Sequence, residues 1–181
     1  MGKIVLTFGL ISGAIISVLM TVNASLADRI GFDKAVITGY ATMVAGFLMI
    51  YFGVRAYRDN VAGGSITFGR AFKAGLLITL IASTCYVASW EFLSRRLMPD
   101  FADRYAAATL AQAREEGKSA EEVAAMERQM GQFLESYQNP LVRIAWTYLE
   151  PLPVGLIFTL VTAGLLRRRK NEAVTPAVVE V

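Results

Sequence analysis

Long runs with few or no charged residues predict helices that cross a lipid bilayer. Four such runs occupy residues 4–26, 35–54, 72–91 and 144–166. A helix rises about 1.5 Å per residue, so it needs roughly 20 mostly apolar residues to cross a hydrocarbon core of about 30 Å. The first run is also longer than the apolar core of a signal peptide, about 7 to 15 residues, which favours a retained span. We therefore expect an all-α fold, a four-helix transmembrane bundle forming a single membrane domain over residues 1–170.

The connection between the third and fourth runs has a helical pattern of its own. An alanine-rich segment follows Pro99 and Asp100 and ends at Gly117. Ser119 and Glu122 then have the spacing of a capping box, in which each side chain satisfies a backbone donor at a helix start. Residues 99–138 are therefore expected to form an extramembrane helical hairpin that caps the bundle. Residues 171–181, after the last run, are expected to form a flexible cytoplasmic tail.

The second helix of this hairpin carries an apolar stripe, because its apolar residues recur every three or four positions. Met126, Met130 and Phe133 belong to the stripe. Two interpretations remain open. The stripe packs on the preceding helix through Phe101 and Tyr105, which is the favoured interpretation, or it docks a protein partner on an adaptable methionine face.

Small residues at intervals of four or seven mark where membrane helices approach closely. Gly9 and Gly13 lie four apart in the first run, and Gly39, Gly46 and Gly53 lie seven apart in the second. We favour packing within one chain, and a homo-oligomer joined through the Gly9 and Gly13 face is the alternative.

The distribution of positive charge predicts the orientation of the spans. Nine Lys or Arg residues flank the bundle on the side of the two chain ends, namely Lys3, Arg55, Arg58, Arg70, Lys73, Arg167, Arg168, Arg169 and Lys170. The short turn on the other side has Arg29 and Lys34. Cytoplasmic loops are the ones enriched in Lys and Arg, so both termini are expected in the cytoplasm.

The amino-acid composition excludes several classes of protein and of functional site. The chain is 55% hydrophobic and 18% charged, which excludes intrinsic disorder, and its single Cys85 excludes a disulfide scaffold. It has no histidine, the commonest general base and metal ligand. No phosphate-binding loop or metal-ligand spacing is present in the sequence. The sequence thus predicts no catalytic residue, cofactor or metal, and the net charge of +3 comes from arginines that flank the spans rather than from a nucleic-acid face.

Two carboxylates at membrane depth are the candidates for chemistry. Glu150 lies inside the fourth run, directly before Pro151 and close to Pro153, and Glu91 closes the third. Because proline has no N–H, the carbonyls of residues 147 and 149 are expected to lose their helical partners. Glu150 and Glu91 could form an ion or proton site. The favoured alternative is structural ion pairing with Arg95 and Arg143.

Several segments resemble one known family. They are GKIVLTFGLISG near the amino terminus, YFGVRAYRD from Tyr51, GGSITFGRAFKAGLL from Gly63, YVASWEF from Tyr86, PDFADRY from Pro99 and NPLVRIAWTYLEPLPVGL from Asn139. They are similar to the bacterial four-span membrane proteins grouped as domain-of-unknown-function family 4199. The resemblance implies a multi-pass protein of the bacterial inner membrane with a helical insertion before its last span, and it implies no activity.

These observations lead to two hypotheses of function. The preferred one is a non-enzymatic accessory, scaffold or assembly subunit that acts through protein partners at the hairpin. The second is a small oligomeric ion- or solute-coupled carrier that uses Glu150 and Glu91.

Overall fold

The computed structural model describes residues 1–167, and the side chains of all of them except residues 27, 28, 30, 32, 33 and 36. This part of the chain forms seven helices: α1 (Gly2–Ile30), α2 (Phe32–Asn60), α3 (Phe68–Arg96), α4 (Phe101–Glu115), α5 (Ala120–Tyr137), α6 (Pro140–Leu149) and α7 (Pro151–Leu166). The tail expected over residues 171–181 lies outside the described residues.

The predicted all-α fold is confirmed. Four segments are long and apolar enough to cross a membrane: Gly2–Leu26, Ile37–Asn60, Phe68–Arg96 and Pro140–Leu166. The helices are longer than the uncharged runs, because the charged residues that flank these runs are also helical. The capping box is also confirmed, since Ser119 and Glu122 exchange their bonds at the start of α5.

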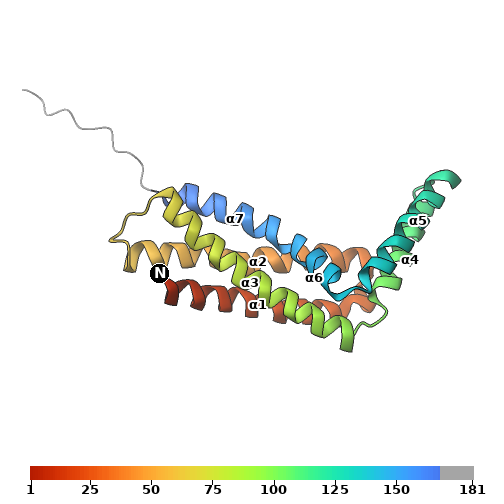
Figure 1. The fold of residues 1–181 in the computed structure, drawn as a ribbon, viewed down its shortest axis with the longest axis horizontal. Coiled ribbons are helices and arrows are strands. Elements are labelled where there is room, and N and C mark those ends of the chain that lie inside the picture. Colours follow the sequence, from red (N-terminus) through yellow and green to blue (C-terminus); the bar gives the residue numbers. More distant parts are fainter. Residues whose placement is uncertain (168–181) are drawn as a thin grey trace, which may run out of the picture.

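The bundle has two distinct ends (Figure 1). At the terminal end lie Met1, the connection between α2 and α3, and Arg167 at the close of α7. At the hairpin end lie the turn between α1 and α2, at Gly31, and the helices α4 and α5. Gly31 has a φ of 86°, a left-handed conformation that glycine adopts without strain. We use these two names for the ends below.

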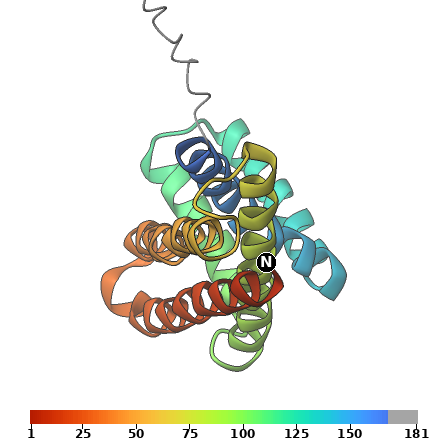
Figure 2. The ribbon, with the colours of Figure 1, turned by 90° about the vertical axis from the view of Figure 1, so that its left-hand side faces the viewer.

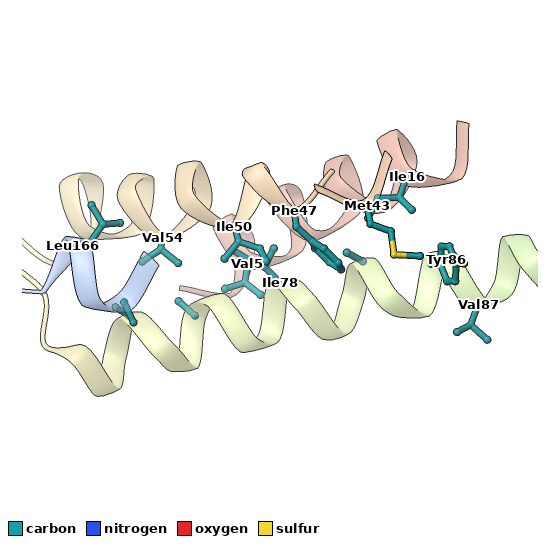
Figure 3. Close-up of a cluster of buried hydrophobic side chains, with 14 of the residues drawn as sticks. Val5, Ile16, Met43, Phe47, Ile50, Val54, Ile78, Tyr86, Val87 and Leu166 are labelled. Atoms are coloured by element: carbon teal, nitrogen blue, oxygen red, sulfur yellow. The ribbon is translucent and has the colours of Figure 1, made fainter. Parts of the chain in front are cut away.

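The helix α3 is central to the bundle, because it packs against α1, α2 and α7. The end-on view in Figure 2 shows α1 and α2 side by side, with α7 on the other side of α2. The core runs along the helices between these elements (Figure 3). Phe47, Ile50, Val54 and Ile78 in this core have no exposed surface.

The glycines of α1 and α2 differ in how closely the neighbouring helix approaches. A Cβ added to Gly9 would lie 2.8 Å from Ile81, and one added to Gly13 would overlap Cys85, so α3 of the same chain covers this face of α1. Gly46 and Gly53 are equally crowded, against Ile16 of α1 and Ile78 of α3 respectively. Gly39 is different: its added Cβ would meet only Asn23 Nδ2, at an ordinary 3.6 Å.

The fourth span is interrupted. The sequence pattern predicts one run over residues 144–166, whereas the helix begins at Pro140 and breaks into α6 and α7 at Glu150. Asn139 caps α6, since its side-chain oxygen accepts a bond of 3.0 Å from the N–H of Leu141. The break follows from Pro151 and Pro153, whose rings remove two backbone donors from the helix.

Candidate functional site

A cavity of about 630 Å³ lies at the hairpin end of the bundle. Residues of α1, α2 and α3 line one side of it, and residues of α4, α5 and α6 line the other. The helix α6 packs on α3, α5 and α7, which leaves the cavity between α6 and α2. The volume falls within the range of about 300 to 1,000 Å³ that is typical of small-molecule sites.

The wall of the cavity is mainly aromatic and methionine-rich. Eight aromatic residues line it, among them Tyr40 of α2, Trp90 of α3, Phe133 of α5 and Trp146 of α6. Met20 and Met43 also line it, from α1 and α2. Such a wall offers a large apolar surface with few polar groups, and each polar group present therefore has a strong influence on which ligand fits.

Glu150 is the carboxylate in this wall. It follows α6 directly, its residue is exposed in the isolated chain, and it is one of the residues that line the cavity. The hydroxyl of Tyr86 on α3 donates a hydrogen bond of 2.6 Å to Glu150 Oε2. Tyr86 itself is buried in the core beside Met43 (Figure 3), which fixes the position of its hydroxyl.

Two backbone carbonyls add to the polarity near Glu150. The carbonyls of Thr147 and Leu149 would bond to the N–H groups of residues 151 and 153 in a continuous helix, but both of those residues are prolines. Thr147 and Leu149 also line the cavity. The carbonyl end of a helix has a partial negative charge. The break in the fourth span thus places a negative region at the cavity.

Glu91, the second carboxylate, belongs to a separate network. Its two oxygens accept bonds of 2.7 and 2.8 Å from the guanidinium of Arg143 on α6, and Arg95 lies 3.0 Å away. Arg143 therefore pairs with Glu91, on another span, whereas Glu150 bonds to Tyr86. The Glu91 and Arg143 side chains are only 16% and 13% exposed, which makes this pair an internal link between α3 and α6.

The same region fastens the hairpin to the bundle. The indole N–H of Trp90 donates to the Tyr137 hydroxyl at 2.9 Å, and the Arg143 guanidinium lies 5.7 Å from the centre of the Tyr137 ring. Burial raises the pKa of the Tyr137 hydroxyl above its ordinary value. The ring of Phe101, at the start of α4, meets the Trp90 ring edge-on at 4.6 Å.

The apolar stripe of α5 lies partly against α4. Tyr105 and Phe133 contact each other with ring centres 5.7 Å apart, and Met126, Met130 and Phe133 are all half-buried. Met130 and Phe133 also line the cavity, whereas Met126 does not. One face of the hairpin is therefore a wall of the candidate site.

A family model described as "Protein of unknown function (DUF4199)" matches residues 7–168. The match covers nearly the whole chain and all four apolar segments. The chain belongs to this family. No curated protein and no solved structure matches the chain.

For this member of DUF4199, the sequence pattern identified Glu150 but missed the aromatic residues around it. Tyr86, Trp90 and Tyr40 appear in the sequence as ordinary residues of apolar helices. The feature that could have identified them is their position, because each lies in the half of its span nearest the hairpin end. Within the described residues, no group of three or more Cys, Asp or Glu side chains is placed to hold a metal ion.

Proposed function

We propose that the chain is a non-enzymatic membrane protein that takes up a small amphipathic solute in the cavity at its hairpin end. The observation that carries the proposal is the cavity of about 630 Å³ with its aromatic wall and the carboxylate of Glu150 in its lining. A wall of this composition suits a ligand with a large apolar body and one polar group, because apolar surface supplies affinity and a few polar groups supply orientation. The solute-coupled hypothesis thus gains support over the accessory one.

A binding role is also favoured by the residues that line the cavity. They include no serine, cysteine or lysine, the side chains that most often act as nucleophiles. Among the lining residues that the structure describes, the ionisable groups are Glu150, Arg104 and tyrosine hydroxyls. A carboxylate bonded to a buried tyrosine can bind and orient a ligand without a covalent step.

We further propose that the protein lies in a bacterial inner membrane with both termini in the cytoplasm. The nine Lys and Arg residues that flank the bundle near the two chain ends support this orientation. The hairpin end, and with it the cavity, would then lie toward the outer face. A solute would reach the site from outside the cell or from the outer leaflet.

The two tryptophans of the chain, Trp90 and Trp146, both line the cavity, so intrinsic fluorescence reports its occupancy. The test uses the full chain in nanodiscs of zwitterionic lipid. The probes are 4-phenylbutylamine, 4-phenylbutanol and 4-phenylbutyrate, which share one carbon skeleton. We expect at least one probe to change the fluorescence saturably, and empty nanodiscs correct for partition into lipid.

A matched pair of variants locates the binding. Gly39→Leu projects into the cavity without a close contact, whereas Gly164→Leu adds the same side chain on α7, where an added Cβ meets nothing within 4 Å. Binding should be lost in Gly39→Leu and kept in Gly164→Leu. Saturable binding by no probe would overturn the proposal. In that case, crosslinking of one protein partner through Met126, outside the cavity, would restore the accessory role.

A further inference from the structure

We infer that the ligand is an amphipathic organic cation, whose ammonium group binds at Glu150 and whose apolar body lies among the aromatic side chains between α2 and the hairpin. This inference rests on the proposed solute-binding function and specifies the chemical class of the solute. It is carried by three observations that concern different groups: the carboxylate, the helix break and the aromatic wall.

The first observation is that Glu150 has capacity for a further partner. An ionised carboxylate has two oxygens and can accept about four hydrogen bonds. Glu150 accepts one, from the Tyr86 hydroxyl, and no Lys or Arg in residues 1–167 forms an ion pair with it within 4.0 Å. Glu91 is the opposite case, since Arg143 and Arg95 already neutralise it. A cationic ligand would give Glu150 the counter-charge that the protein supplies to Glu91.

The second observation is the helix break beside this carboxylate. The Thr147 and Leu149 carbonyls have no N–H donor four residues further on, because Pro151 and Pro153 occupy those positions. The negative end of α6 adds to the charge of Glu150. An ammonium group has several N–H donors and a positive charge, so it can satisfy a carboxylate and a free carbonyl at once.

The third observation is the composition of the wall. Aromatic rings attract cations through the negative potential of their faces, and the attraction is strongest when the site is shielded from water. Tyr40, Tyr86 and Trp90 line the cavity from the two helices that face Glu150. The same rings supply apolar surface for the body of the ligand.

Arg104 is the other charged residue among the lining residues that the structure describes. It belongs to the hairpin, is exposed and has interactions of its own. A ligand with a carboxylate would be attracted to Arg104 and repelled by Glu150. Arg104 therefore favours a negatively charged ligand and Glu150 a positively charged one, and this preference can be measured.

The experiment compares the dissociation constants of the three phenylbutyl probes for the same nanodisc preparation. The ammonium group of the amine brings to the Glu150 carboxylate a positive charge that the alcohol lacks, so the amine should bind about 10 to 100 times more tightly than the alcohol. The carboxylate probe should bind more weakly than both. In Glu150→Gln, which keeps the shape of the side chain, the amine should lose this advantage, so that the dissociation constants of the amine and the alcohol become similar.

The outcomes separate the inference from the function on which it rests. Equal binding of amine and alcohol, or an unchanged preference in Glu150→Gln, would overturn the cation inference and leave a solute-binding protein. Tightest binding of the carboxylate, lost in Arg104→Gln, would overturn it in favour of an anionic ligand. Binding of none of the three would overturn both. Retained alcohol binding shows that Glu150→Gln is folded.

Discussion

The two ends of the bundle are built differently, although the same helices run through both. Toward the terminal end, Ile50, Val54 and Ile78 have no exposed surface, and glycines let the backbones approach. Toward the hairpin end, the fourth span breaks, and aromatic side chains surround a cavity. Trp146 in its wall is 53% exposed. The comparison teaches that close packing is concentrated in one half of the bundle and that the candidate site lies in the other.

The largest expected effect comes from disturbing the close-packed half. A Cβ added to Gly155 of α7 would overlap the side chain of Thr79 on α3, whose hydroxyl bonds to Thr159 at 3.0 Å. Gly155→Leu should therefore separate the two helices and remove most of the folded protein from the membrane. Gly164→Leu on the same helix has open space and should accumulate normally. Immunoblots of membrane fractions measure both, and equal amounts would contradict the close packing.

The next effect concerns the ion pair that joins α3 to α6 at the edge of the cavity. Arg143→Met leaves Glu91, whose side chain is 16% exposed, with Arg95 alone. We expect a loss of about 2 to 3 kcal/mol in the free energy of unfolding, near the lower limit for buried pairs because Arg95 remains. Arg95→Met is the control, because that side chain is 61% exposed and its removal should cost less than about 1 kcal/mol. Unfolding in mixed micelles gives both values. A larger loss in the free energy of unfolding for Arg95→Met than for Arg143→Met would mean that Arg95 is the main partner of Glu91.

A smaller effect is expected at the carboxylate of the cavity. Tyr86→Phe removes the hydroxyl that bonds to Glu150 at 2.6 Å, and a bond to an ionised group contributes about 1.5 kcal/mol or more. Tyr148→Phe removes a neutral bond of 3.0 Å to Thr84, for which about 0.5 to 1 kcal/mol is typical. Thermal unfolding of the two variants in one detergent compares them. Equal shifts in the unfolding temperature would mean that the charge of Glu150 does not strengthen its hydrogen bond to Tyr86.

The smallest effect on stability is expected in the hairpin, at the start of α5. The Ser119 N–H bonds to the Glu122 carboxylate at 2.8 Å, and this bond lowers the pKa of Glu122. A lowered pKa in the folded state means that the bond stabilises α5 above the ordinary carboxyl pKa of about 4.3 and is lost as the pH falls through the folded value. The protection factors of the amides at the start of α5, which correct hydrogen exchange for its intrinsic rate at each pH, should thus fall in acid.

Ser119→Ala serves as the comparison for this pH dependence. Removal of a serine cap typically costs about 1 kcal/mol of helix stability. The variant should exchange faster at neutral pH in the first turn of α5, with no change in α7. An identical acid response in wild type and in Glu122→Gln would show that the carboxylate does not act in the cap.

The sequence predicts the close-packed half better than the cavity. Charge-free runs and glycine spacing depend on local composition, so they identify the four spans and most of the crowded glycines. Gly39 is the exception: it keeps the interval of seven but lies at the cavity, where the neighbouring helix is more distant. The spacing of glycines along one helix does not determine the distance to the neighbouring helix.

The pairing of charges also depends on the three-dimensional arrangement. Arg143 lies seven residues before Glu150, on a similar helix face, which made a pair between neighbours in the chain plausible. The structure instead joins it to Glu91, 52 residues away. Tyr86 could not be identified as the partner of Glu150 for the same reason, since they are 64 residues apart and meet only after α3 and the fourth span pack together.

The link between Glu91 and Arg143 also imposes an order of events during biosynthesis. Ribosomes add about 5 to 20 residues per second, so the 52 residues between these partners require roughly 3 to 10 seconds. During this interval, Glu91 has only Arg95 as a cationic partner, because Arg143 follows later in the chain. In the orientation proposed above, the hairpin would pass to the outer face before the fourth span enters, so the link between α3 and α6 would form late in insertion.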